Sequence, residues 1–297
     1  MSNIGQVSRA DHASETYMGE AFWRQRAVLA TMRPRLETLF STLRAHMPAG
    51  HPGDLSKGDW VKLVTLALEF KPEKIIEVGR CYGNSTIALT EAANRLGVRE
   101  KAFTSICLTN WAASASAIAR VVPSDWFMPQ DLLIENVCHT DFATLLGDSE
   151  RVLIVWDAHG FDVAQTLLGT LLPLLENRQH VVIIHDIGDI RYHPHENAYA
   201  GYGIWKGEIL WPGPTLRLGN VFGAVSEIIP LVDFVTRNAL NLFSVEHSTR
   251  LVFDGDESKL QRMRAELGDS MFDRASGYHW LTLNESRGPF TFPILSK

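Results

Sequence analysis

The sequence predicts an α/β domain in which a mostly parallel sheet is covered by helices on both faces. Short apolar segments rich in Val and Ile alternate with helical segments across residues 75–185, an order typical of parallel strands joined by crossover helices. The segment 75–78 runs directly into a glycine turn and a helix, and two later strand-like segments end at Asp157 and His185. Because the carboxyl ends of strands line the ligand crevice of an open parallel sheet, the fold class also locates the site.

Composition and charge narrow the class of protein. The chain has 297 residues, of which 45% are hydrophobic and 21% charged, with a formal net charge of −6. Basic residues are not clustered as nucleic-acid binding requires, and no apolar run approaches the roughly 20 residues of a membrane span. We therefore expect a cytoplasmic protein with neither a nucleic-acid nor a membrane partner. Cys81, Cys107 and Cys138 lack metal or disulfide spacing and are expected to be buried free thiols.

The N-terminal part is predicted to be a tail followed by helices. Residues 1–18 are polar and mixed in charge, and we expect a disordered tail. Residues 19–47 have a helical pattern, in which Pro34 predicts a break or kink. Together with the Pro- and Gly-containing linker 48–53 they form an N-terminal helical segment, 19–53. The main domain, 54–297, then begins with a helix that Asp54 or Ser56 can cap.

The elements of the main domain alternate up to residue 186. Strands are expected at residues 75–78, 103–108, 152–156 and 181–185, with a weaker one at 132–137, and helices at 86–96, 112–121 and 162–175. Residues 187–220, rich in aromatic residues, Gly and Pro, form an insertion that fits a lid and a dimer surface equally well. Helices at 221–235 and 257–267 and strands at 242–246 and 278–283 follow.

The glycine turn carries most of the functional information. Gly79 and Gly83 let the backbone turn sharply and approach a ligand closely. Glu77, at the end of the strand, can accept hydrogen bonds from an amino group or a ribose. A dinucleotide site needs G-x-G-x-x-G, whereas these glycines are four apart and follow an acid that would repel a pyrophosphate. An NAD-dependent oxidoreductase is therefore disfavoured.

Further polar residues stand at two other strand ends. Asp157 and His159 follow one strand, and His185 and Asp186 end the next. Acids at adjacent strand ends can hold Mg²⁺, which prefers carboxylates and water. Plainer accounts stay open, since Asp157 can cap the following helix and His185 can be a hydrogen-bonded core residue.

The order and spacing of three segments resemble those of one enzyme family. E-V-G-x-x-x-G-x-S-T at 77–86, D-A-H-G-F-D at 157–162 and V-V-I-I-H-D at 181–186 look like the motifs of class I S-adenosylmethionine (SAM) methyltransferases. They are similar to the group of catechol O-methyltransferase-like and macrocin-type O-methyltransferases, over roughly residues 55–190. The resemblance implies a Rossmann-like, seven-stranded, mostly parallel sheet with an antiparallel edge strand. It also implies a three-layer α/β/α arrangement and an N-terminal helical extension.

The resemblance implies SAM as cofactor and assigns residues to it. Glu77 and Gly79 would contact its amino-acid end, and Asp141 would lie near the adenine. Thr109 stands where related enzymes carry an acid that binds the ribose hydroxyls. The implied cofactor-binding residues are Glu77, Gly79, Tyr82, Gly83, Ser85, Thr109, Asn110, Trp111, Asp141 and Asp157.

The implied chemistry is methyl transfer to an oxygen of a small hydroxylated molecule, such as a sugar or natural product. Asp157 and Asp186 match the metal ligands of metal-dependent members, where Mg²⁺ would lower the pKa of an acceptor hydroxyl. His159 is the nearest candidate general base, and Asp157 and His185 are the other candidate catalytic residues. The alternative is a methyltransferase-fold binding module that has lost catalysis, which Thr109 and the unclear third metal ligand favour. Homo-oligomers fit the sequence as well as a monomer does.

Overall fold

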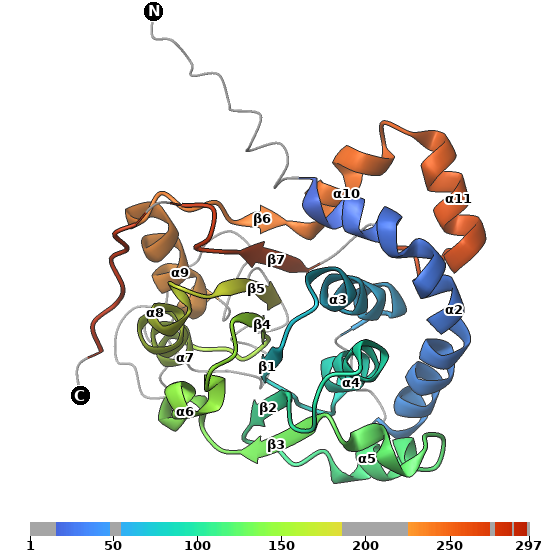
Figure 1. The fold of residues 1–297 in the computed structure, drawn as a ribbon, viewed down its shortest axis with the longest axis horizontal. Helices are drawn as coiled ribbons and strands as arrows, with labels where there is room; N and C mark the ends of the chain where they lie inside the picture. Colours follow the sequence, from blue (N-terminus) through green and yellow to red (C-terminus); the bar gives the residue numbers. More distant parts are fainter. Residues whose placement is uncertain (1–15, 48–54, 186–224, 274–276, 287, 296–297) are drawn as a thin grey trace, which may run out of the picture.

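The fold is built on a seven-stranded sheet with the strand order β3-β2-β1-β4-β5-β7-β6 (Figure 1). The computed structural model describes residues 16–47, 55–185, 225–273, 277–286 and 288–295. The strands are β1 Lys74–Val78, β2 Phe103–Cys107, β3 Gln130–Ile134, β4 Arg151–Trp156, β5 Gln179–His185, β6 Phe243–Ser244 and β7 Tyr278–Leu281. The first five run parallel, whereas β7 pairs antiparallel with both β5 and β6. The predicted Rossmann-like class is confirmed.

Helices cover both faces of the sheet and complete three layers (Figure 1). The first face carries α3 Lys57–Phe70, α4 Asn84–Leu96 and α5 Ala112–Ile118, with α2 Tyr17–His46 across them. The second face carries α6 Phe142–Leu146, α7 Phe161–Thr166, a π-helix Leu167–Leu171, α8 Leu172–Leu175 and α9 Val225–Arg237. Each face has its own apolar core. The central strands are therefore buried on both sides, which is why they read as continuous apolar runs.

The N-terminal helix α2 shares its core with the end of the chain. It packs against α10 Val245–Phe253 and α11 Glu257–Leu267 (Figure 1). A side chain at Gly19 would lie 2.6 Å from the Ser248 carbonyl oxygen, so the two helices are in close backbone contact. The helix begins at Tyr17, inside the segment 1–18 assigned to a tail. Residues 1–15 lie outside the described residues.

The predicted break at Pro34 does not occur. Helix α2 runs through Pro34 without interruption. Met32 and Leu36, on either side of it, are both buried in the first core, and the Thr38 hydroxyl donates to the Pro34 carbonyl at 2.9 Å. Burial of one continuous apolar stripe therefore outweighs the backbone hydrogen bond that proline cannot make.

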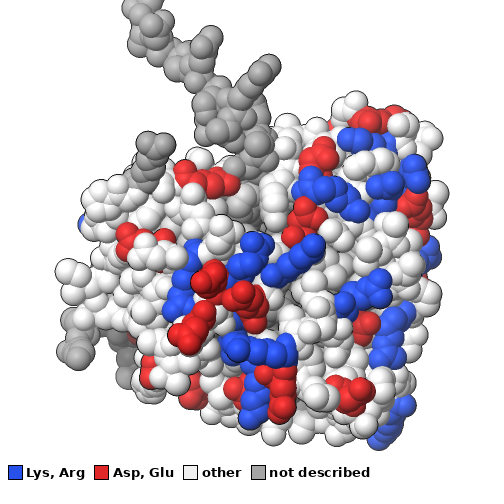
Figure 2. All heavy atoms as spheres, in the orientation of Figure 1, with Lys and Arg blue, Asp and Glu red and all other residues white. Residues whose placement is uncertain are grey.

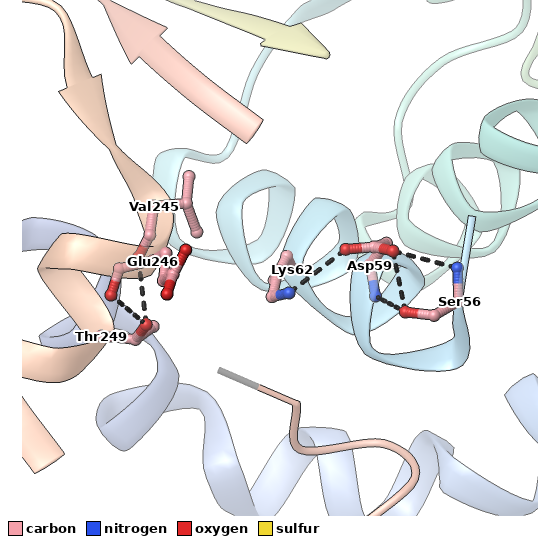
Figure 3. Close-up of polar contacts among 6 residues, drawn as sticks. All are labelled: Ser56, Asp59, Lys62, Val245, Glu246 and Thr249. Atoms are coloured by element: carbon pink, nitrogen blue, oxygen red, sulfur yellow. Dashed lines mark hydrogen bonds and ion pairs between the residues drawn. The ribbon is translucent and has the colours of Figure 1, made fainter. Parts of the chain in front are cut away.

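Helix α3 begins with a reciprocal capping box (Figure 3). The Asp59 backbone N–H donates to Ser56 Oγ at 3.1 Å, and the Ser56 N–H donates to Asp59 Oδ2 at 3.0 Å. Asp59 also pairs with Lys62, whose Nζ lies 3.2 Å from Asp59 Oδ1 although the Lys62 side chain is buried. Ser56 is thus the cap that the sequence offered. The other candidate, Asp54, lies outside the described residues.

Several element boundaries differ from those predicted. The strand expected at 242–246 ends at Ser244, which caps α10 by accepting from the His247 N–H at 3.3 Å. The weaker strand lies at Gln130–Ile134 rather than 132–137. The helix expected at 162–175 contains a π-helical turn just before Pro173, which cannot donate a backbone hydrogen bond. The insertion 187–220 lies outside the described residues.

Charges are interspersed on the visible face of the molecule. In Figure 2, Lys and Arg side chains lie beside Asp and Glu side chains over α2, α3 and α4. Ion pairs one helical turn apart join Arg33 with Glu37 in α2 and Arg262 with Glu266 in α11. Among the described helices, none combines the length and the apolarity needed to cross a membrane.

Candidate functional site

A cavity of about 340 Å³ opens at the carboxyl ends of β1, β2, β3 and β4. Its volume lies within the range of small-molecule sites. The lining residues are Val78, Gly79, Cys81, Ile106, Cys107, Leu108, Thr109, Glu135, Asn136, Val137, Asp157, Ala158, His159 and Val163. Apolar walls from the second core therefore meet polar groups from four strand ends, at the edge the fold class predicts.

Glycine is required at both ends of the turn between β1 and α4. Gly79 has φ +100°, and a Cβ there would lie 2.3 Å from the Asp157 carbonyl oxygen. Gly83 caps α4 with φ +88°, and its Cβ would lie 2.0 Å from Trp111 Cε3. The turn is thus pressed between the end of β4 and a buried indole ring. This packing places Gly79 and Cys81 at the cavity wall.

Glu77 lies beneath the cavity rather than in its wall. Its fully buried carboxylate accepts from Thr86 Oγ1 at 2.7 Å and from the Ser105 hydroxyl. Burial raises the pKa of the Glu77 carboxyl above its ordinary value, while hydrogen bonds from Ser105, Ser85 and Thr86 and the charge of Arg80 oppose that rise. In the described structure Glu77 is part of a buried polar network, and it does not line the cavity that was expected to hold its ligand.

Arg80 completes this network and was not foreseen from the sequence. Its side chain is 1% exposed. Nη1 donates to the Ser105 carbonyl and hydroxyl oxygens at 2.7 and 2.9 Å, and Nη2 to the Thr109 and Leu133 carbonyls at 3.1 and 3.3 Å. One guanidinium therefore ties the end of β2 to the end of β3.

The ends of β2 and β3 provide the polar groups on one side of the cavity. The Thr109 hydroxyl lies 3.2 Å from Cys107 Sγ and donates to the Cys81 carbonyl at 3.3 Å. Burial would raise the pKa of the Cys107 thiol, but hydrogen bonds from Thr109 and from the N–H groups of Cys81 and Arg80 outweigh it and lower the pKa. The cysteines are free as predicted, but Cys81 is exposed and Cys107 only half-buried. Both cysteines line the cavity, which explains why their side chains are not buried in the apolar core.

Glu135 is a cavity residue that the sequence reasoning missed. It directly follows β3, and its N–H donates to the Cys107 carbonyl at 3.2 Å. Thr140 Oγ1 donates to Glu135 Oε1 at 2.7 Å. Because the predicted strand ran on to residue 137, it placed Glu135 inside a strand instead of at its end. The strand-end rule applied to the observed boundary would have found it.

Asp157 and His185 pair across the ends of β4 and β5. His185 Nδ1 lies 3.0 Å from Asp157 Oδ1. The buried His185 ring also packs on Tyr278, with centroids 4.6 Å apart. Asp157 and His159 line the cavity, whereas His185 stands behind Asp157. Asp157 does not cap the following helix, because that cap is Gly160 without a side-chain bond.

Other predicted residues lie apart from the cavity. Asp141 caps α6, where its carboxylate accepts from the Thr144 N–H at 3.1 Å. Trp111 is buried against Gly83, and Ser85 is buried beside Glu77. The remaining two, Tyr82 and Asn110, are half-buried and exposed respectively, and neither is a lining residue.

The described residues do not assemble a metal site. No group of three or more His, Cys, Asp or Glu side chains within the described ranges has a metal-binding arrangement. Asp157 Oδ1 is already engaged by His185. Asp186, its expected partner, lies outside the described residues.

Comparisons with known proteins gave structural similarities only. No protein-family model matches the chain, and no curated protein sequence matches it. A cofactor-bound structure of Rv0187 from MTB is 15% identical and covers 84% of this chain and 89% of that chain, with a TM-score of 0.46. The O-methyltransferase TomG from Streptomyces achromogenes, in complex with SAM, is 16% identical and covers 69% and 81%, with a TM-score of 0.43. The methyltransferase PaMTH1 from Podospora anserina, bound to S-adenosylhomocysteine (SAH), is 16% identical and covers 82% and 95%, with a TM-score of 0.45.

Proposed function

We propose that this protein is a SAM-dependent methyltransferase that methylates an oxygen of a small hydroxylated molecule. The observation that carries the proposal is the turn at residues 79–83, which requires glycine at both ends and forms one wall of the cavity. Its glycine spacing is the spacing that resembles SAM enzymes and differs from dinucleotide sites. A cavity with both apolar walls and strand-end polar groups suits a nucleoside with a charged tail.

The cavity divides into two parts that suit the two halves of SAM. The amino-acid end would lie against the glycine turn, where the backbone approaches most closely. The nucleoside would lie at the ends of β2 and β3, between the apolar Leu108 and Val137 and the polar Thr109 and Glu135. A carboxylate such as Glu135 can accept from two neighbouring hydroxyls, which a threonine at the end of β2 cannot match.

The residues at the end of β4 are suited to the acceptor. Methyl transfer to a hydroxyl needs the oxygen in line with the sulfonium and its proton removed. His159 lines the cavity and is the candidate base, while Asp157 holds His185 by a hydrogen bond that fixes its ring. The proposed roles of His159 and Asp157 do not depend on a metal ion, since the described His, Cys, Asp and Glu side chains do not form a metal-binding group. Metal binding by Asp157 and Asp186 stays a prediction from the sequence.

Calorimetric titration with SAH, with and without Mg²⁺, tests the proposal first. Micromolar binding is expected, and NAD serves as the matched control that should not bind. Transfer of a labelled methyl group from SAM to a panel of hydroxylated acceptors then separates an enzyme from the alternative, a binding module without catalysis. Failure to bind SAH in either condition contradicts the proposal that the protein is an enzyme.

A further inference from the structure

The buried Arg80 has a geometry that compensation of charge alone would not require. All four of its hydrogen bonds given above go to β2, to the loop after it, or to β3. Three of the acceptors are backbone carbonyls and the fourth is the Ser105 hydroxyl, so none carries a charge. Arg80 is linked to Glu77 indirectly, through the Ser105 hydroxyl, which accepts from Arg80 and donates to Glu77. The guanidinium group therefore donates its hydrogen bonds to β2, β3 and the loop after β2, and among the described residues it does not form a direct ion pair.

Two of these carbonyls hold the nucleoside side of the cavity. Thr109 is itself a lining residue, and Leu133 lies two residues before the lining residue Glu135. Between them, the β2–β3 ladder extends one step past Ile134, through the Glu135 N–H and the Cys107 carbonyl. Arg80 connects the two strands at this end of the ladder, because its Nη2 donates to both the Thr109 and the Leu133 carbonyl. Without it, the Thr109 and Leu133 carbonyls would lose a charged donor that they share.

We propose that Arg80 is a positioning residue for the nucleoside half of the cavity. It fixes the separation of the β2 and β3 ends, so that Cys107, Thr109 and Glu135 face a bound nucleoside together. The proposal rests on the proposed SAM site for the identity of that ligand. The role needs arginine in particular, because a planar fork with five N–H donors can bond both strand ends at once, whereas a lysine ammonium is a single point on a flexible stem.

Replacement with lysine separates positioning from charge. Arg80→Lys keeps the positive charge near Glu77 but cannot bridge Thr109 and Leu133. We expect SAH affinity to fall about 10- to 100-fold, the size of one or two lost charged hydrogen bonds. The same factor is expected for 5′-methylthioadenosine, which has the nucleoside half without the amino-acid end. A general loss of structure would instead lower the melting temperature and the amount of binding-competent protein, and the protein that still binds would keep its original affinity for both ligands.

A double variant separates the positioning role of Arg80 from the effect of leaving the buried Glu77 carboxylate without a nearby positive charge. Glu77→Gln combined with Arg80→Met leaves no buried charge in the network, and we expect it to be more stable than Arg80→Met alone but equally weak in nucleoside binding. The proposal is overturned if Arg80→Lys binds SAH within about twofold of the original chain, or if the double variant regains full affinity.

Hydrogen exchange makes the test independent of the ligand. In Arg80→Lys the amides of residues 105–109 and 133–135 should exchange faster, while those of β4 and β5 should not change. If the original chain binds no SAH, the proposed function fails, and unchanged exchange at these amides would separately overturn the role of Arg80.

Discussion

Alanine at Gly83 should destabilise the protein more than alanine at any comparable capping glycine. Gly83 and Gly97 cap the two ends of the same helix, α4, and both have left-handed backbone conformations, with φ of +88° and +65°. A Cβ at Gly83 would lie 2.0 Å from Trp111, whereas ordinary van der Waals contact begins at 3.4 Å; a Cβ at Gly97 would meet nothing within 4 Å. Gly97→Ala is therefore a matched control that reports backbone strain without the clash.

The structure gives the size of each effect. A non-glycine residue in the left-handed region costs about 1–2 kcal/mol. Forcing a methyl group into a packed site typically costs a further ~1–3 kcal/mol. We therefore expect Gly97→Ala to lower the free energy of unfolding by about 1–2 kcal/mol and Gly83→Ala by about 2–5 kcal/mol. The latter is a large share of the ~5–15 kcal/mol typical of whole proteins.

Urea unfolding of both variants, followed by circular dichroism, measures this difference. In the Gly83→Ala background, Trp111→Leu should cost less than it does alone, because the smaller side chain relieves the clash. Equal destabilisation by the two glycine substitutions would refute the reasoning, since it would mean that Trp111 does not constrain the turn.

Three further predictions follow from single contacts. Ser56→Ala removes a helix cap and should cost about 1 kcal/mol in urea unfolding, with little effect on SAH binding. Burial lowers the pKa of His180, whose Nε2 accepts from the Leu283 N–H at 2.9 Å, so stability should be complete above the unfolded pKa of about 6.5 and decline as pH falls below it. Unfolding of His180→Gln at pH 5 and 7 should show a weaker pH dependence than the original chain. Asp157→Asn, which alters the partner of His185, should retain SAH affinity but lower methyl transfer about 100-fold or more, and full activity would remove Asp157 from the mechanism.

The fold was predictable because its signals are local and strong. The parallel strands are buried on both faces, and their apolar runs stand out between helical segments. Helix α10 was not predicted, because residues 242–246 have a strand-like pattern, while the deciding contact is a cap by Ser244. The break predicted at Pro34 is absent, because packing of α2 along its whole length decides whether a helix continues.

The site was predictable in position but less so in its residues. The rule for strand ends located Asp157 and His159 at the cavity, and the family resemblance located Thr109 there. The rule could not predict that the Glu77 side chain is buried in a polar network, because a residue's position along a strand does not tell which side chains surround it. Arg80 was out of reach for another reason: it contacts Leu133, 53 residues away, through a long side chain that could as well extend into solvent.

The contact between α2 and α10 also determines when the N-terminal end of α2 can become buried during synthesis. Gly19 meets Ser248 and Val252, so the part of α2 near Gly19 is covered only after the last fifth of the chain has been reached. At the ~5–20 residues per second of protein synthesis, the delay between making Gly19 and making its partners in α10 is on the order of 10–50 s. During this time Met18 and Phe22, both buried in the finished fold, are available to chaperones. A nascent chain stalled before residue 245 should therefore be held by them, and one released after α11 should not.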